Sequence, residues 1–344
     1  MIDQQIDAIE ALLKGVNKTF GDNSLYFLGK VKPLPVECVP TGSLSLDYAI
    51  GGNELFLGIP HGRITEIWGP KDSGKTSLCN HIIASAQKQG KPTFFLDYEH
   101  SYDPLYAQAL GVDIDKLLFG QYTELEEGWT IVESIIRSVK DAVIVIDSIA
   151  AMTPRSEIEG EVGDEHVGKQ PKKLAQAMRR NMGAVREHNT ALVVTNQIRH
   201  KIGTGWGERT ETQAGGEALR HALALQIDLW PSKIEKVKDD IIARKILATI
   251  SHSKIARPYC KAQYRLVFGK GIDPMPDIIE FGVMFGALEQ RGAFYYLPGN
   301  EKHIAQGEAN ATRFLIDNPE IMEGIVETIR KNTVKEKEDA EVSV

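Results

Sequence analysis

Several features are scarce in this chain of 344 residues, and each scarcity excludes a class of protein. The three cysteines (Cys38, Cys79 and Cys260) lie far apart and form no C-x-x-C pair, so we expect neither a disulfide framework nor a zinc site. The most apolar run, residues 143–152, is too short to cross a bilayer and contains Asp147. The first residues are polar and acidic, which is not typical of a secretion signal. We therefore expect a cytoplasmic protein with reduced thiols and no membrane partner.

Positive charge is also in short supply. The formal net charge is −7 and the sequence pI is about 5.8, so no overall positive field attracts nucleic acid. This balance argues mildly against DNA binding, although a local basic surface is compatible with it. The hydrophobic and charged fractions, 42% and 25%, are ordinary for a globular protein. A chain of this length can form one large α/β domain and a smaller one.

What the sequence does contain is a phosphate-binding loop. Residues 69–76, Gly-Pro-Lys-Asp-Ser-Gly-Lys-Thr, fit the pattern G-x-x-x-x-G-K-[ST] in full. The glycines let successive N–H groups turn toward phosphate oxygens, Lys75 can reach the β- and γ-phosphates, and the Thr76 hydroxyl can bind Mg²⁺. A chance glycine-rich turn is the alternative, but the apolar strand before the loop and the helical spacing after it favour a nucleotide site. The predicted nucleotide-binding residues here are Gly69, Pro70, Lys71, Asp72, Ser73, Gly74, Lys75, Thr76 and Ser77.

The apolar pattern around this loop predicts an α/β fold with a mostly parallel sheet. Strands are expected at 93–97, 117–119, 142–147 and 191–194, and helices at 104–110, 129–139 and 172–188. Beyond residue 223, three strands (224–229, 246–251 and 264–268) are expected, the first two separated by a charged connection at 233–245. The ends of the chain are expected to hold an amphipathic helix at 4–20, a proline-containing linker at 31–40, a small lobe after 271 and a disordered tail from 332. The pattern leaves open whether the first helix packs on its own core or on a neighbouring subunit.

Three polar residues at predicted strand ends are candidates for the chemistry. Asp147 follows an unbroken apolar strand, and beside Thr76 it can hold Mg²⁺, through water. Glu99, two residues after the strand that ends at Asp97, is the candidate to activate the attacking water; a surface glutamate is the alternative. Gln197 ends a later strand at the same edge of the sheet and can sense the γ-phosphate.

The segment after Gln197 differs from the rest of the chain. Residues 198–214 are rich in glycine and basic residues, include Trp206 and show no apolar periodicity. A long loop of this kind inside a compact domain is usually functional, and cations beside an aromatic ring suit single-stranded nucleic acid. A lid over the nucleotide is the alternative. A second loop, 157–164, is acidic, but the helix after it carries Lys172, Lys173, Arg179 and Arg180.

Together, the motifs of this chain resemble the bacterial RecA recombinase family. The motifs are residues 41–47, 69–76, 96–100, 103–104, 147–148, 157–164, 196–199, 215–216 and 307–312, which span nearly the whole chain. The resemblance implies an ATP- and Mg²⁺-dependent helical filament of many copies on single-stranded DNA, which pairs that strand with homologous double-stranded DNA in recombination and repair. It also implies a RecA-type P-loop ATPase core at 37–272, a subunit-docking helix and linker at 1–36, a small α+β C-terminal domain at 273–331 and a tail at 332–344. The divergence of the chain suggests a phage-encoded member.

The resemblance also assigns residue roles. Glu99 would activate water, Tyr106 would stack on adenine with Asp103 nearby, and Gln197 would couple the γ-phosphate to the loop that follows it. Lys254, together with His252, would reach the phosphates of a neighbouring subunit. The residues implied to line DNA are Val167, Lys172, Arg179, Arg199, His200, Lys201, Ile202, Gly203, Trp206, Gly215 and Gly216.

The chain departs from the family pattern at several places. His252 stands where the family usually has a lysine, and His221 replaces an interface phenylalanine. Basic residues expected near 230 and 247–249 are absent, so a second DNA site would instead use Lys233, Lys236, Lys238, Arg244 and Lys245. Two other functions remain open from the residues alone: a ring-shaped helicase or motor ATPase, and a nucleotide-sensing binding protein without strand exchange.

Overall fold

The computed structural model describes residues 2–21, 24–30, 36–160, 169–200, 211–213, 216–238 and 240–342. The chain divides into two compact units, residues 1–36 and 37–344, which are described separately. Within the described residues, no helix is both long enough and apolar enough to cross a membrane.

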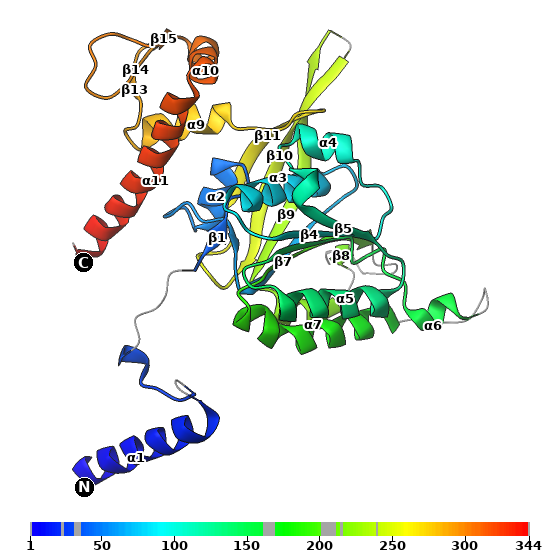
Figure 1. The fold of residues 1–344 in the computed structure, drawn as a ribbon. Helices are drawn as coiled ribbons and strands as arrows, with labels where there is room; N and C mark the ends of the chain where they lie inside the picture. The colour runs from blue at the N-terminus through cyan, green and yellow to red at the C-terminus, as the bar shows by residue number, and fades with distance from the viewer. Residues whose placement is uncertain are drawn as a thin grey trace, which may run out of the picture. The chain divides into compact units, whose positions relative to one another are not determined.

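The chain alternates helices and strands up to residue 229, continues with antiparallel strands to residue 273 and ends in a small, mostly helical domain (Figure 1). The helices are α1 (Ile2–Phe20), η1 (Leu28–Lys30), α2 (Leu44–Ile50), α3 (Lys75–Lys88), α4 (Pro104–Ala109), η2 (Ile114–Lys116), α5 (Leu125–Ser138), α6 (Arg155–Ile158), α7 (Lys169–Glu187), α8 (Gly216–Ala222), α9 (Met275–Met284), α10 (Glu308–Asp317) and α11 (Pro319–Val342). The strands are β1 (Cys38–Val39), β2 (Ile59–Pro60), β3 (Arg63–Gly69), β4 (Thr93–Asp97), β5 (Leu117–Gln121), β6 (Val143–Asp147), β7 (Ala191–His200), β8 (Glu211–Gln213), β9 (Leu225–Val237), β10 (Asp240–Ser253), β11 (Lys261–Val267), β12 (Gly271–Asp273), β13 (Glu289–Arg291), β14 (Phe294–Tyr296) and β15 (Ala305–Gln306).

A ten-stranded sheet forms the centre of the second unit, in the order β12-β11-β10-β9-β3-β7-β6-β4-β5, with β8 paired to β7. Strands β9, β3, β7, β6, β4 and β5 are parallel to one another, because helices connect most of them in sequence. Strands β10, β11 and β12 add antiparallel pairs at one side. The α/β class with a mostly parallel sheet is therefore confirmed.

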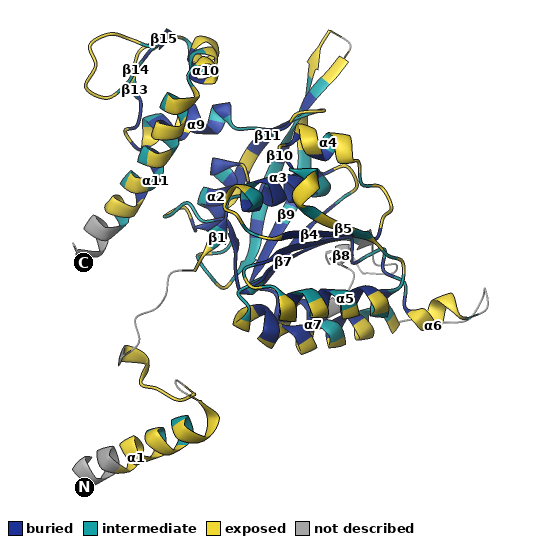
Figure 2. Ribbon diagram, viewed as in Figure 1, coloured by how far each residue is buried: buried dark blue, intermediate teal, exposed yellow. Residues whose placement is uncertain are grey.

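Each face of the sheet has its own apolar core. On one face α2 and α3 cover the strands, with Ile67, Leu78 and Ile82 fully buried. On the other face α5 and α7 pack against Ile144, Leu192 and Val194 (Figures 1 and 2). Strand β6 is buried along its whole length, which explains why its sequence is continuously apolar and does not alternate.

The small C-terminal domain has a third core, made by α9, α10 and α11 with the sheet β13–β15. Buried carboxylates attach it to α2. Asp277 accepts hydrogen bonds from the Ser43 hydroxyl and the Ser45 amide, each at 2.9 Å. Arg330 of α11 forms an ion pair at 3.1 Å with Asp47, whose pKa burial raises to about 6 against the opposing charge of the arginine.

Three segments differ from the sequence predictions. The charged connection at 233–245 is largely β-structure, because β9 and β10 continue through it as a hairpin (Figure 1). The linker at 31–40 includes strand β1, which pairs with β2. Residues 332–342, expected to be disordered, continue helix α11; Thr333 is buried and Lys337 forms an ion pair with Glu54. Charge content alone missed this helix because its contacts come from segments distant in the sequence.

The first unit contains helix α1, as the apolar spacing predicted. Ile9, Leu12 and Phe20 are exposed on this helix, at 44%, 58% and 76%. The helix therefore carries large apolar side chains that its own unit does not cover.

Candidate nucleotide-binding site

The predicted phosphate loop joins the carboxyl end of β3 to the amino end of α3. Its path needs both glycines. Gly74 has φ +84°, and a Cβ on Gly69 would lie 2.3 Å from the Leu229 carbonyl oxygen. No side chain caps the first turn of α3, so its N–H groups are free to face an anion.

Two buried polar groups fit this loop to a phosphate. Lys75 is only 8% exposed, and its ammonium donates to the carbonyl oxygens of Gly69 and Pro70, at 3.1 and 2.8 Å. Burial lowers the pKa of Lys75, a cost that an anionic ligand would offset. The hydroxyl oxygen of Ser73 is buried and lacks a partner among the described residues. The loop thus offers donors and a cation that a nucleoside triphosphate can use, with Lys71, Asp72 and Ser77 along the same turn.

The candidate Mg²⁺ ligands are brought together as predicted. Asp147 ends β6, and its carboxylate accepts a hydrogen bond of 2.6 Å from the Thr76 hydroxyl. The Thr195 hydroxyl of β7 donates to the other oxygen. Burial raises the pKa of Asp147, and these two hydrogen bonds oppose that shift. A hydroxyl beside a buried carboxylate next to the phosphate loop fits a Mg²⁺ ion held partly through water.

The two residues predicted to act on the γ-phosphate contact each other. The amide nitrogen of Gln197 donates to the Glu99 carboxylate at 2.7 Å, although the residues lie 98 positions apart. Asp97 orients the turn that carries Glu99 by accepting from its backbone N–H at 3.0 Å. Asp97 itself is held by Gln121 and by the backbone N–H of Tyr102. The sequence placed Glu99 and Gln197 at one edge of the sheet, and the structure joins them directly.

The residues assigned to adenine lie close to the first turn of α3. Asp103 caps α4 by accepting from the backbone N–H groups of Leu105 and Tyr106. The Tyr106 hydroxyl lies 2.8 Å from the Ser77 hydroxyl, so the ring is held beside the first turn of α3. Because Ser77 follows the phosphate loop directly, a base bound against Tyr106 would lie within reach of that loop.

Lys254 does not approach the phosphate loop of its own chain. The backbone N–H of Lys254 bonds to Ala224, whose N–H bonds to Ile64 at the start of β3, whereas the loop begins at Gly69. Five residues of strand separate these points, about 16 Å. The Lys254 ammonium instead donates to the His221 carbonyl oxygen at 3.0 Å. Any role at a triphosphate therefore concerns a second copy of the chain.

Part of the predicted DNA surface can be described. Lys172 and Arg179 lie two helical turns apart on α7 and are exposed, and within the described residues neither has an acidic ion-pair partner. Their neighbours Lys173 and Arg180 are paired with Glu126 and Glu133. Arg199 and His200 end β7, and Gly216 begins α8. The other predicted DNA residues, Val167, Lys201, Ile202, Gly203, Trp206 and Gly215, lie outside the described residues.

The ends of the predicted long loop are more regular than expected. Strand β7 continues through His200 and pairs with β8, so residues 198–200 and 211–213 form an antiparallel extension of the sheet. The apolar pattern missed it because all of these residues except Ile198 are polar. Of the cations proposed for a second DNA site, Lys233, Lys236 and Lys238 are exposed on the β9–β10 hairpin. Arg244 instead donates to the Asp72 carbonyl oxygen of the phosphate loop, at 2.9 Å.

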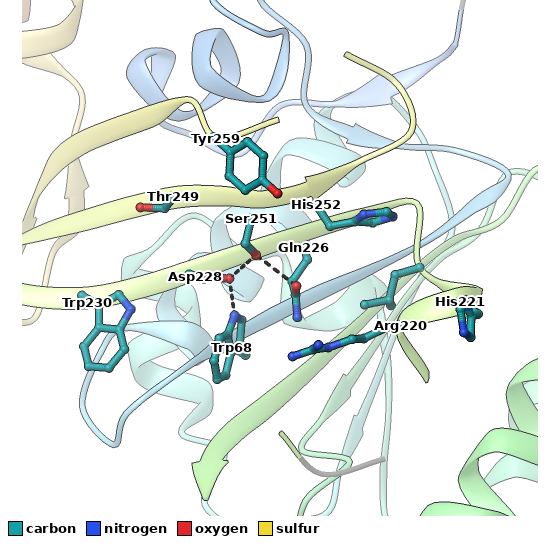
Figure 3. A pocket seen from close by; sticks show the side chains of 11 residues that line it. Trp68, Arg220, His221, Gln226, Asp228, Trp230, Thr249, Ser251, His252 and Tyr259 are labelled. Carbon is teal, nitrogen blue, oxygen red and sulfur yellow. Dashed lines mark hydrogen bonds between the residues drawn. The ribbon is translucent and has the colours of Figure 1, made fainter. Parts of the chain in front are cut away.

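The sequence analysis missed a buried polar group on the opposite face of β3. Glu66 is fully buried and accepts hydrogen bonds from Asn196 and Gln226, at 2.7 and 2.6 Å. Beyond Gln226 lies a pocket of about 510 Å³ (Figure 3). Its lining includes Trp68, Arg220, Asp228, Trp230, Ser251 and His252. The signal in the sequence was an acidic residue in the middle of an otherwise buried strand.

Two family models match the chain. The RecA N-terminal domain matches residues 7–273, and the RecA C-terminal domain matches residues 276–334. The first match includes the phosphate loop, Glu99, Asp147 and Gln197. Proteins of this family are DNA-dependent ATPases that use ATP and Mg²⁺, and they form filaments on DNA. The matches confirm the family resemblance that the motifs indicated.

Proposed function

This chain belongs to the RecA family, and on that premise we propose that it is a DNA-dependent ATPase that forms a helical filament on single-stranded DNA. In that filament it pairs the bound strand with homologous double-stranded DNA and exchanges strands, in recombination and repair. The observation that carries the proposal is the contact between Gln197 and Glu99 beside the phosphate loop. It joins the residue placed for water activation to the strand that leads into the predicted DNA-binding segment.

ATP is held by the phosphate loop and the first turn of α3, with its base toward Tyr106. When bound, Mg²⁺ neutralises charge on the triphosphate and acts as a Lewis acid. Thr76 and Asp147 hold the ion, and Lys75 supplies a fixed positive charge in a site from which much of the water is excluded. Glu99 orients the attacking water and accepts its proton, while the Gln197 amide holds the Glu99 carboxylate in place.

A second copy of the chain completes the site. Lys254 lies at the far end of β3 from its own phosphate loop, so it serves the triphosphate of the next subunit in the filament. His252 lies on the same strand end and contributes less charge than a lysine would at neutral pH. Helix α1 docks on the neighbour through its uncovered apolar residues, Ile9, Leu12 and Phe20.

DNA contacts come from the segment that follows Gln197 and from the free cations of α7. Lys172 and Arg179 bind phosphates of the strand, because no acidic side chain among the described residues neutralises them. Because β7 carries Gln197 and then enters this segment, a change in the Gln197–Glu99 contact alters the path of the backbone beside DNA. ATP binding therefore favours the state that grips DNA, and hydrolysis releases it.

The test is a comparison of DNA binding with and without nucleotide. Fluorescence anisotropy of a labelled single-stranded oligonucleotide should show tight binding with a non-hydrolysable ATP analogue and at least tenfold weaker binding with ADP. Glu99→Gln should hydrolyse ATP about a hundredfold more slowly while keeping ATP-dependent DNA binding. Electron microscopy of the ATP complex should show helical filaments. Equal affinity with and without nucleotide would refute the proposal, and closed rings would favour a ring-shaped motor.

A further inference from the structure

A chain of buried hydrogen bonds crosses the sheet from the pocket of Figure 3 to the Gln197–Glu99 contact. At the pocket end, Trp68 and Ser251 donate to Asp228, and the Ser251 hydroxyl also lies 3.0 Å from the Gln226 side-chain oxygen (Figure 3). Gln226 donates to Glu66, and so does Asn196. The side-chain oxygen of Asn196 then accepts from the backbone N–H of Gln197, at 2.9 Å. The chain of contacts therefore ends at the backbone of Gln197, the residue whose side chain contacts Glu99.

We infer that Glu66 is a positioning residue for ATP hydrolysis: it fixes Asn196, which fixes the backbone of Gln197 and so the Gln197–Glu99 contact. The inference rests on the proposed ATPase function and adds a residue to it. Glu66 touches neither Glu99 nor the phosphate loop, and its side chain lies on the face of the sheet opposite α3. Its effect passes through the strand, because Asn196 and Gln197 are neighbours whose side chains lie on opposite faces of β7.

Both amides present their NH₂ groups to Glu66. The Asn196 amide is oriented by its other contact, because its oxygen accepts from the Gln197 N–H. The Gln226 oxygen lies near the Ser251 hydroxyl, whose single proton is shared between this oxygen and Asp228. The ionised carboxylate offers a full acceptor to each NH₂ group, whereas the protonated acid has one weaker acceptor, its hydroxyl oxygen, and a proton that needs an acceptor of its own. The network thus favours the ionised state of Glu66.

The surroundings of Glu66 make that state sensitive to pH near neutrality. Burial raises the pKa of Glu66 to about 7, and the two amides oppose the shift. Asp228 of β9 also raises it and Arg220 of α8 lowers it. On β10, His252 lines the same pocket, and α7 turns the uncharged residues Leu174, Met178 and Val185 toward the sheet. As pH falls through about 7, Glu66 gains a proton and loses one of its two acceptor roles.

The experiment measures kcat and KM for ATP in the presence of single-stranded DNA, between pH 6 and 8.5. Glu66→Gln keeps the size of the side chain but presents one acceptor and one donor, as the protonated acid does. We expect kcat to fall about tenfold through misplacement of Glu99, with KM for ATP within about twofold of wild type. The rise in kcat through pH 7 should be present in the wild type and absent from the variant.

Two further variants separate positioning from general damage to the core. Thr65→Val removes a neighbouring buried hydroxyl of β3 that has no partner among the described residues, and it should leave kcat and its pH profile unchanged. The exchange Glu66→Gln with Gln226→Glu restores an acceptor opposite every donor, so it should return kcat to within about threefold of wild type. Wild-type kcat in folded Glu66→Gln, or a reduced kcat that keeps the inflection near pH 7, would overturn the inference. Absence of ATP hydrolysis in the wild type would instead refute the proposed function.

Discussion

Buried carboxylates occur both at the phosphate-loop edge of the sheet and at the junction with the C-terminal domain, but their partners differ. At the junction, Asp47 is held by the Thr41 backbone N–H, the Thr41 hydroxyl and the Arg330 guanidinium. Asp277 is held by Ser43 and Ser45. Protein groups surround both carboxylates, so this cluster joins two parts of the fold.

The phosphate-loop edge leaves polar groups available. The Lys75 ammonium donates to uncharged carbonyl oxygens of its own loop, and the hydroxyls of Ser73 and Ser148 are buried without a partner among the described residues. A buried polar group without a partner costs about 1–3 kcal/mol, which a ligand can recover. Burial of a carboxylate therefore does not by itself identify a functional site. The difference between the two clusters lies in the unsatisfied groups beside the phosphate loop.

The largest effect is expected for a change at the phosphate-loop edge of the sheet. Lys75→Ala removes a buried positive charge at the phosphate loop, and we expect ATP turnover to fall at least a hundredfold, because Lys75 is the only lysine or arginine that is buried among the described residues. Steady-state hydrolysis with single-stranded DNA measures this. Lys71→Ala is the matched control, because Lys71 is exposed on the same loop. Wild-type turnover in Lys75→Ala would mean that the phosphate-loop edge, like the junction with the C-terminal domain, has only a structural role.

A change at the junction with the C-terminal domain should instead lower the stability of the folded protein. Arg330→Gln removes the only cation that forms an ion pair with Asp47 among the described residues. The pKa of Asp47 should therefore rise further above about 6. A carboxyl whose pKa is raised by folding loses stability as pH rises through that value, so the variant should be weakened most at alkaline pH. Arg330 is partly exposed, so we expect a loss of about 2 kcal/mol at pH 8 and less than half of that at pH 5.

Urea unfolding at the two pH values measures this loss, with Lys331→Gln as the control because its ion pair with Glu327 is exposed. An equal loss of stability at pH 5 and pH 8 would show that Arg330 acts through packing and not through the charge of Asp47. In either case ATP turnover should stay at its wild-type value at 25 °C.

The smallest effects belong to the surface of α7. Lys172→Ala and Arg179→Ala should each weaken single-stranded DNA binding several-fold and reduce the slope of log K against log salt by about 0.7. Lys173→Ala, which removes a cation already paired with Glu126, should change the affinity less. Titrations at three salt concentrations distinguish the cases. Equal losses for all three variants would show that α7 contributes only its overall charge.

The sequence was sufficient for much of the candidate nucleotide site. A fixed loop pattern and apolar strands that end in polar residues placed Lys75, Asp147, Glu99 and Gln197 at one edge, because parallel strands end together. Glu66 was not predicted, because its role depends on amides of β7 and β9 that are 130 and 160 positions away. The length of the β9–β10 hairpin was missed for a related reason: its outer residues mix charged side chains with exposed apolar ones such as Ile234, Val237 and Ile241, and the strands are defined by their pairing.

Helix α2 has only seven residues, yet two cores depend on it. Leu46, Ala49 and Ile50 belong to the core under α3, whereas Leu44 and Tyr48 belong to that of the C-terminal domain. A chain cut off after Asp273 would leave Leu44, Tyr48 and Asp47 without their covering residues. The ATPase core therefore cannot simply be excised from this protein for separate study, and solubility after such a truncation would require polar replacements along that side of α2.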